Sequence, residues 1–304
     1  MEEKEGRCLR QEKFPHRRVS YMPTYGWYIL PFLIMSTTIV LFPLAYSLWL
    51  SFYRFNLSQP YLGQSFVGLA NYYAALRDPI VLSSIKITFK YVLESLAGEF
   101  LIGFALALLM MNRRLRGLSV FRFFLIIPLM LTPVAVGLVW KFFYSYTGLV
   151  NYILKLVGLN PVSWFSGDNA LLSVVIVTVW RNSPFVFLVL LAGMQTVPPT
   201  LIEAARIDGA SYWQIFSRIT LPLISSFIII ILVIRTTNIL RHVDLIFALT
   251  FGGPGRVTET LSFLIYTNSF LFFEMGYGSA LSFLLIGVTS VIIWGYMRFR
   301  MRGE

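Results

Sequence analysis

The chain has 304 residues, of which 57% are hydrophobic and only 13% are charged, and its formal net charge is +11. A soluble domain carries about twice that share of charged residues, so the composition indicates a protein that crosses a membrane several times. No dense basic stripe alternates with exposed aromatic residues, which argues against nucleic-acid binding. A single cysteine, Cys8, and two distant histidines, His16 and His242, exclude a disulfide framework and a cysteine or histidine metal cluster.

Six apolar segments are long enough to cross a bilayer, because a span needs about 20 residues at a rise of about 1.5 Å each. They cover residues 27–51, 87–111, 121–144, 171–196, 221–250 and 280–301. The first segment is too long for the apolar core of a signal peptide, and no small-residue cleavage pattern follows it. The sequence therefore predicts an all-α membrane protein with six transmembrane helices.

The basic residues between the spans predict the orientation. One side of the membrane holds fifteen Lys and Arg: Lys4, Arg7, Arg10, Lys13, Arg17, Arg18, Arg113, Arg114, Arg116, Arg122, Arg206, Arg218, Arg298, Arg300 and Arg302. The other side holds four, which are Arg54, Arg77, Lys155 and Arg256. Since basic residues concentrate on the cytoplasmic side, both termini are expected in the cytoplasm, with a basic cytoplasmic tail over residues 1–26. The protein is thus expected to be a multi-pass protein of the cell membrane.

The connection between the fourth and fifth spans has the most specific pattern. Thr200 and Glu203 read as a capping box that starts a short helix, and Ser211 and Gln214 as a second one. Gly209 lies between them and is expected to end the first helix in the left-handed region that glycine adopts cheaply. The segment is therefore predicted to be a helix, a glycine turn and a second helix.

Three residues of the second short helix, Trp213, Phe216 and Ile219, recur at helical spacing and are expected to form an apolar side available for docking. Pro222 suits the first turn of the fifth span. Physical chemistry alone leaves two interpretations open. The segment is either a compact turn or an element that docks on a partner.

The same connection resembles a family signature. Glu203-Ala204-Ala205, three residues, Gly209, nine residues, Ile219, one residue and Leu221-Pro222 reproduce the EAA motif of ABC importer membrane subunits. "VWRNSPFVFLVLLAGMQTVPPTLIEAARIDGAS" (179–211), "LTFGGPGRVTETLSFLIYTNSF" (249–270) and "FVGLANYYAALRDP" (66–79) are also similar to that family. The resemblance is to carbohydrate permeases of the maltose, trehalose and glycerol-phosphate type.

This resemblance implies a type I ABC importer permease (MetI-like) fold over residues 27–304, with a coupling loop at residues 197–220 that docks on a cytoplasmic ATPase. The implied ATPase-coupling residues are Glu203, Ala204, Ala205, Asp208, Gly209, Ala210 and Trp213. The chain has no G-x-x-x-x-G-K-S/T phosphate loop, so it is expected to be no enzyme and to hold no cofactor, ATP and Mg being bound by the partner ATPase. The implied partners are a second homologous permease, two ATPase subunits, an extracytoplasmic solute-binding protein, a sugar and the lipid bilayer.

Polar residues inside the spans are the next candidates, because an intramembrane charge is functional by default. In the second span Ser95, Glu99, Gly103 and Ala107 recur every four residues, which favours a small and polar face for helix packing. The run Arg181-Asn182-Ser183-Pro184 in the fourth span has two open interpretations. It either faces a cavity or satisfies a proline kink.

The fifth span carries the substrate-binding candidates, which are Arg235, Asn238, Arg241, His242 and Asp244. Arg235, Asn238 and His242 are expected on one helix face, and Arg241 and Asp244 are spaced to pair. Guanidinium and amide groups suit hydrogen bonds to sugar hydroxyls, and the alternative is an ionic network that braces the membrane subunits. Many of the resembling permeases have Phe-Asp at the position of Val243-Asp244. The resemblance therefore does not fix which face of the fifth span contacts the substrate.

Two classes of function follow. The first is the membrane subunit of a binding-protein-dependent importer for a disaccharide or oligosaccharide, working by alternating access, with a phosphorylated polyol such as glycerol phosphate as the second substrate class. The other is an ion-driven secondary carrier. The docking loop argues against a carrier, as does the lack of a paired short-helix repeat between the two halves.

Overall fold

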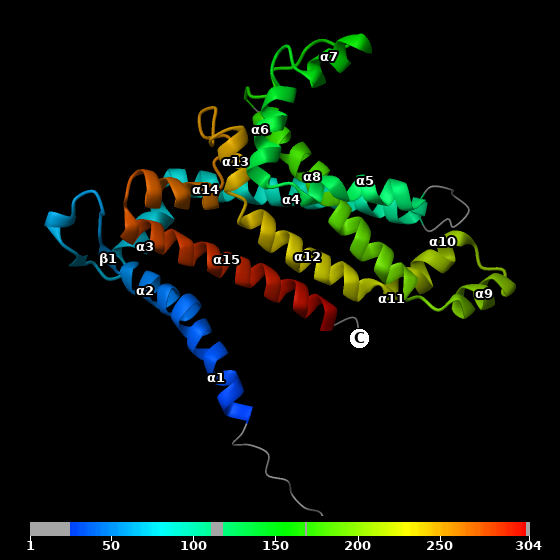
Figure 1. Cartoon of the computed structure of the whole chain (residues 1–304), viewed down its shortest axis with the longest axis horizontal. Coiled ribbons are helices and arrows are strands. Elements are labelled where there is room, and N and C mark those ends of the chain that lie inside the picture. Colours follow the sequence, from blue (N-terminus) through cyan, green and yellow to red (C-terminus); the bar gives the residue numbers. More distant parts are fainter. Residues whose placement is uncertain (1–24, 111–117, 168, 302–304) are drawn as a thin grey trace, which may run out of the picture. The chain divides into compact units, whose positions relative to one another are not determined.

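The structure is a computed structural model that describes residues 25–110, 118–167 and 169–301. The chain divides into two compact units, Met1–Ser47 and Leu48–Glu304, and each is described by itself. Over the described ranges every element is helical except one antiparallel pair of two-residue strands (Figure 1). This confirms the all-α class, while residues 1–24 of the expected basic tail lie outside the described residues.

The elements in chain order are α1 (Tyr25–Ser36), η1 (Thr37–Leu41), α2 (Phe42–Leu50), β1 (Tyr53–Arg54), η2 (Pro60–Leu62), β2 (Ser65–Phe66), α3 (Ala70–Arg77), α4 (Pro79–Met110), α5 (Leu118–Met130), α6 (Pro133–Phe143), α7 (Leu149–Leu156), α8 (Asn169–Gln195), α9 (Pro199–Ile207), α10 (Tyr212–Ile215), η3 (Phe216–Thr220), α11 (Leu221–Leu223), α12 (Ser225–Leu240), α13 (Asp244–Leu249), α14 (Leu261–Tyr266), η4 (Thr267–Leu271) and α15 (Met275–Met301).

The first unit contains α1, the π-helical turn η1 and most of α2. Together these elements form a helix over Trp27–Leu50 that is long and apolar enough to cross a membrane. Its large apolar side chains, among them Trp27, Phe32 and Ile39, are exposed. An apolar helix that leaves these side chains uncovered is suited to contact with lipid.

The second unit is built on α4 and α8, which pack along each other. The predicted small and polar face of α4 is buried, and Gly98 and Gly103 make the close approach feasible. A Cβ atom at Gly98 would lie 2.6 Å from Val179 Cγ2, and one at Gly103 would lie 2.7 Å from Val186 Cβ. Glycine at these two positions therefore lets the α4 and α8 backbones come together without a steric clash.

The third predicted span is bent, which corrects the expectation of one straight helix over residues 121–144. Helices α5 and α6 meet at 100°, across a break at Leu131 and Thr132. Pro133 takes the first helical position of α6, and the Thr132 hydroxyl accepts a hydrogen bond from the Ala135 N–H at 3.4 Å. Proline and a capping threonine are start signals, so α6 begins as a new helix.

The fifth predicted span also differs from the expectation of one helix over residues 221–250. Helix α12 ends at Leu240, and the chain turns over residues 241–243 before α13 begins. At its other end, the helix that starts at Tyr212 runs through Leu223 and meets α12 at 61°. The span is therefore a bent pair, and the polar stretch after Leu240 does not continue the helix.

The remaining spans are helical, as predicted, but their lengths differ from the predicted lengths. Helix α4 begins eight residues before the predicted start because the Asp78 carboxylate accepts the Ile80 N–H at 2.8 Å and Pro79 takes the first helical position. Helix α15 begins at Met275 rather than at residue 280. Among the described residues, four helices are long and apolar enough to cross a membrane, or six spans if each bent pair counts as one.

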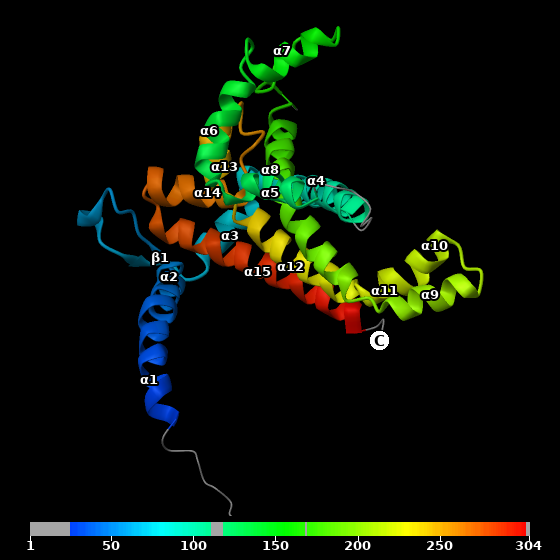
Figure 2. The ribbon, with the colours of Figure 1, turned by 45° about the vertical axis from the view of Figure 1, so that its right-hand side comes forward.

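Helix α8 connects two helical segments that lie beyond its opposite ends. In both views, α7 lies beyond the start of α8, and the pair α9–α10 lies beyond its end (Figure 2). The β1–β2 hairpin and α3 pack against the beginning of α15, far from α9. The hairpin and the α9–α10 pair therefore lie in separate parts of the second unit.

Candidate functional site

The coupling loop folds as a helix, a glycine turn and a helix, as predicted. Gly209 has a φ of +77°, and the Ala210 N–H donates to the Ala205 carbonyl at 2.9 Å across the turn. No atom lies within 4 Å of the position that a Cβ at Gly209 would take. The backbone conformation, and not crowding within this chain, is therefore the reason for glycine at this position.

The two predicted capping boxes have different outcomes. The second is confirmed, because the Ser211 N–H donates to Gln214 Oε1 at 2.7 Å and the Gln214 N–H donates to Ser211 Oγ at 3.4 Å. The first is wrong. Pro198 is the N-cap of α9, and no side-chain cap is formed. Pro199 then takes the first helical position, which leaves Thr200 inside the helix, where its hydroxyl is no longer the cap.

The surface of the coupling loop is open. Glu203, Ala204, Asp208, Gly209 and Trp213 are exposed, and the Trp213 side chain keeps 71% of its area accessible. Among the other residues predicted to couple to the ATPase, Ala205 and Ala210 are half-buried. A cavity of about 300 Å³ lies beside the glycine turn, bordered by Asp208, Gln214 and Arg218. An exposed tryptophan is a residue type enriched where partner proteins bind most strongly.

The predicted apolar docking side is narrower than expected. Phe216 is half-buried, and its ring centroid lies 5.6 Å from that of Phe104 on α4 in an edge-on contact. Ile219 packs against the buried residues around α8. Of the three residues predicted to face a partner, only Trp213 stays exposed, since the other two are half-buried in contacts within this chain.

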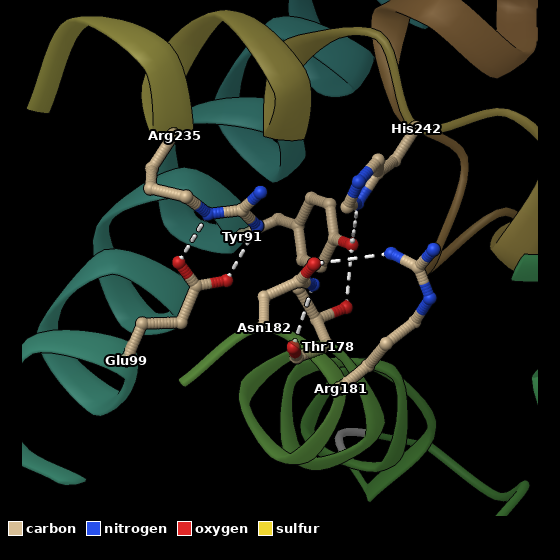
Figure 3. A network of polar contacts seen from close by, with 7 residues as sticks. All are labelled: Tyr91, Glu99, Thr178, Arg181, Asn182, Arg235 and His242. Carbon is tan, nitrogen blue, oxygen red and sulfur yellow. Dashed lines mark hydrogen bonds and ion pairs between the residues drawn. The ribbon is translucent and has the colours of Figure 1, made fainter. Parts of the chain in front are cut away.

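Within the apolar interior of the second unit lies a polar cluster of seven residues (Figure 3). Its members are Tyr91, Glu99, Thr178, Arg181, Asn182, Arg235 and His242. Arg235 donates from Nε and Nη2 to the two carboxylate oxygens of Glu99, both at 2.7 Å. The side chains are 4% and 0% exposed. This bidentate ion pair joins α12 to α4. Removal of either residue would leave the other charge buried without a partner.

The second part of the cluster is a chain of hydrogen bonds centred on Tyr91. The Tyr91 hydroxyl lies 2.7 Å from Thr178 Oγ1 and 3.1 Å from His242 Nδ1. Thr178 gives its one proton to the Val174 carbonyl at 2.8 Å. Tyr91 must therefore donate to Thr178, and His242 must donate to Tyr91, which places a proton on His242 Nδ1.

Arg181 connects the cluster to the break in the third span. Its Nε and Nη2 donate to the Leu131 carbonyl at 3.2 and 2.9 Å, and its Nη1 donates to Asn182 Oδ1 at 3.0 Å. A helix break leaves carbonyl groups without helical partners, which is costly in a membrane. Arg181 thus supplies hydrogen bonds to the Leu131 carbonyl at the break between α5 and α6. The sequence did not predict this role.

The predicted substrate residues fall into two groups. Arg235 is buried against Glu99, and His242 is half-buried against Tyr91, whereas Asn238, Arg241 and Asp244 are exposed. The single face expected for Arg235, Asn238 and His242 is therefore divided. In the described part of the chain Arg241 and Asp244 form no ion pair. That expectation assumed a continuous helix, and α12 ends at Leu240 between Asn238 and Arg241.

Sequence reasoning missed Glu99 as the partner of Arg235 and Tyr91 as the partner of His242. One signal was present. Glu99 and Arg235 are opposite charges within apolar spans, and such charges pair because neither is tolerated alone in lipid. Tyr91 gave no signal of its own, since a tyrosine in a span is most often a packing residue.

The described architecture defines a class: a multi-pass helical membrane protein with a buried polar cluster and an exposed helix–glycine–helix loop. A family model described as binding-protein-dependent transport system inner membrane component matches residues 99–303. The chain belongs to this family. It is the permease component of an ABC transporter, whose ATPase is a separate subunit, and it is a multi-pass inner-membrane protein.

Relatives match almost the whole chain. The trehalose/maltose transport system permease protein of Thermococcus litoralis is 36% identical over 277 residues, which cover 90% of this chain and 92% of that protein. The sulfoquinovosyl glycerol transport system permease protein of Agrobacterium fabrum is 34% identical over 88% of this chain and 87% of its own length. Among solved structures, a bacterial alginate ABC transporter in complex with an alginate pentasaccharide-bound periplasmic protein contains a chain with a TM-score of 0.77 and 25% identity, covering 91% of this chain and 94% of that chain.

Proposed function

We propose that this chain forms one half of the translocation pathway of an ATP-driven sugar importer, with a disaccharide or oligosaccharide as its substrate. The observation that carries the substrate class is the 36% identity, over 90% of the chain, to the trehalose/maltose permease protein. The full-length similarity to the alginate transporter chain supports a saccharide as well. The second half of the pathway is a homologous permease subunit, and a solute-binding protein delivers the sugar from outside.

The coupling loop is proposed to dock on the ATPase, with both termini and this loop in the cytoplasm. Support comes from the exposed Trp213 and Ile207, which are 71% and 86% accessible, and from the cavity of about 300 Å³ beside Gly209. The loop's own polar backbone groups are satisfied locally by the glycine turn and the Ser211–Gln214 box. The loop is therefore a preformed surface, which lowers the entropy lost on docking.

The sugar path is proposed to run past the residues of the fifth span that stay exposed. Asn238, Arg241 and Asp244 offer an amide, a guanidinium and a carboxylate, which together donate to and accept from sugar hydroxyls. Arg235 and His242 are assigned a supporting role, because their polar groups already bond to Glu99 and Tyr91. They fix the end of α12, from which the exposed residues project.

A phosphorylated polyol is the second candidate substrate. Arg241 is exposed, and no carboxylate pairs with it among the described residues. An unpaired guanidinium suits a phosphate group as well as a hydroxyl. A transport experiment must therefore test both sugars and phosphorylated polyols as substrates.

The test reconstitutes the chain with the second permease, two ATPase subunits and the solute-binding protein in lipid vesicles. We expect ATP hydrolysis and uptake that depend on a disaccharide such as trehalose or maltose, and neither activity from this chain alone. Stimulation by glycerol phosphate, with none by sugars, would select the second candidate. ATP-independent uptake driven by an ion gradient would overturn the proposal altogether.

Alanine variants of the exposed residues of the fifth span test whether these residues line the proposed sugar path. Asn238→Ala is expected to weaken uptake affinity by about two- to tenfold, and Arg241→Ala by about tenfold or more, because neutral hydrogen bonds contribute roughly 0.5–1.5 kcal/mol and charged ones roughly 1.5–3 kcal/mol. Lys86→Ala is the control, since Lys86 is also an exposed basic residue but belongs to α4 and not to the fifth span. Unchanged affinity in both variants, in an intact complex, would remove these residues from the sugar path.

A further inference from the structure

The β1–β2 hairpin and α3 lie at the end of the second unit opposite the coupling loop (Figure 1). A cavity of about 550 Å³ lies beside them and is here called the outer pocket. It is bordered by the β1–β2 hairpin and its loop, by α3 and by the segment that leads from η4 into α15. This volume falls in the usual range of ligand sites. The residues that carry the argument are Arg54, Asn71, Asp78, Asn268, Glu274 and Tyr277.

The walls of the outer pocket are held by backbone contacts and are therefore formed before any ligand arrives. The Leu57 N–H donates to the Phe273 carbonyl at 2.9 Å, and the Gly276 N–H donates to the Phe55 carbonyl at 3.2 Å. Asn71 ties the hairpin to α3, because its Nδ2 donates to the carbonyl of Tyr53 at 3.0 Å and to a second carbonyl just before the hairpin at 2.8 Å. A preformed pocket binds without a large ordering cost.

The groups left free in the outer pocket are hydrogen-bond acceptors. Asn268 is nine-tenths buried, and its Nδ2 donates to the Leu264 carbonyl at 2.8 Å. Within the described residues nothing donates to its Oδ1, and the same holds for Asn71 Oδ1. An amide oxygen that has no donor among these residues is free to accept a hydrogen bond from a ligand in the pocket.

The charge of the outer pocket is negative. Asp78 accepts from the Ile80 N–H at 2.8 Å and from the Tyr277 hydroxyl at 3.3 Å, but it forms no ion pair within the described residues. Glu274 is exposed and is likewise outside the ion pairs of that part of the chain. Among the described residues that line the pocket, Arg54 is the one cation, and it is exposed at the hairpin. Two carboxylates and free amide oxygens favour a ligand that is cationic and rich in donors.

We propose that the outer pocket receives a lysine or arginine side chain of the extracytoplasmic solute-binding protein. The inference rests on the proposed function, because the proposed orientation places this end of the unit outside the cytoplasm. A free metal ion fits less well, since no group of three or more His, Cys, Asp or Glu residues is gathered anywhere in the described ranges. A basic side chain meets both carboxylates and the amide oxygens, and the pocket has room for it.

The experiment uses the reconstituted complex and measures ATP hydrolysis against the concentration of sugar-loaded binding protein. For Glu274→Lys we expect half-maximal stimulation to need about three- to tenfold more binding protein, with the maximal rate retained, because a charge at a docking surface acts mainly on association. The shift should shrink as salt is added. Glu274→Gln and Asp78→Asn should give smaller shifts in the same direction. Glu94→Gln is the control, since Glu94 pairs with Lys90 on α4 outside the pocket.

A covalent probe adds a second readout. Cys8 is the only cysteine in the sequence of this chain, so Cys8→Ser with Glu274→Cys leaves this subunit one thiol, at the pocket. A short thiol-to-amine cross-linker should then join this subunit to a lysine of the binding protein. Equal half-maximal concentrations for wild type, Glu274→Lys and Asp78→Asn would overturn the pocket assignment while leaving the proposed function intact. A wild-type complex that no sugar-loaded binding protein stimulates would overturn both.

Discussion

The polar cluster and the coupling loop belong to the same unit of the chain but differ in whether their charged groups are buried and paired. In the cluster, Glu99 and Arg235 are buried and bond to each other, and His242 bonds to Tyr91. In the loop, Glu203 and Arg206 are exposed, and neither belongs to an ion pair within the described residues. Apolar surroundings make an unpaired charge costly, whereas water does not. The difference separates residues that hold the fold from residues that are free to meet a partner.

The largest effect is expected from breaking the buried ion pair. Arg235→Ala leaves the Glu99 carboxylate buried without its partner, which costs about 3–5 kcal/mol. The variant should give a poor yield of folded subunit and fail to assemble with its partners. The yield of purified complex and its thermal unfolding in detergent measure this loss.

A double variant tests the cause of that loss. Glu99→Leu with Arg235→Met removes both charges at similar volume, so we expect much of the stability to return. Arg241→Ala is the matched control, because Arg241 is exposed. If Arg235→Ala instead assembles normally and binds sugar more weakly, Arg235 belongs to the sugar path and not to the brace.

An effect on coupling without loss of the fold is expected at Gly209. Gly209→Val puts a β-branched side chain at a φ of +77°, and no atom lies within 4 Å of the new Cβ. A free loop that leaves this conformation relieves strain of about 1–2 kcal/mol, which docking must then restore, so association with the ATPase is expected to weaken about tenfold. The larger side chain also thickens the docking surface. We expect normal membrane insertion and a severe loss of transport.

The control for Gly209→Val is a second glycine that has a positive φ but lies outside the coupling loop. Gly158 has a φ of +79°, and a Cβ added there would also have no atom within 4 Å, but this glycine follows α7 at the other end of α8. Gly158→Val should carry similar strain and leave ATP-driven transport near wild type. Equal loss in both variants would mean that strain alone, and not docking, explains Gly209.

The smallest effect is expected within the cluster, at a neutral hydrogen bond. Tyr91→Phe removes the hydroxyl that joins Thr178 and His242, and interhelical hydrogen bonds in membranes contribute about 0.6–1.7 kcal/mol. Thermal unfolding should detect a modest drop, with assembly retained. Tyr152→Phe on α7 is the control, because Tyr152 is exposed, and it should unfold as wild type does. No difference between the two variants would contradict a bracing role for Tyr91.

The sequence anticipated the helical spans and the glycine turn because both depend on local chemistry. A run of apolar residues predicts a span wherever it occurs, and Gly209 with Ser211 and Gln214 specifies a helix end and a helix start within a few residues. The same local reasoning failed where two signals compete. Pro198 displaced Thr200 from the cap of α9, and Pro133 with Thr132 started a new helix inside the third span.

The sequence by itself determined the six apolar spans, the helix–glycine–helix loop and the presence of charges that need partners in the membrane. Only the tertiary structure decided which partner each polar group has. Glu99 and Arg235 are 136 residues apart in the chain, and Tyr91 and His242 are 151 residues apart. Their pairing depends on how α4, α8 and α12 pack, and no local pattern encodes that packing.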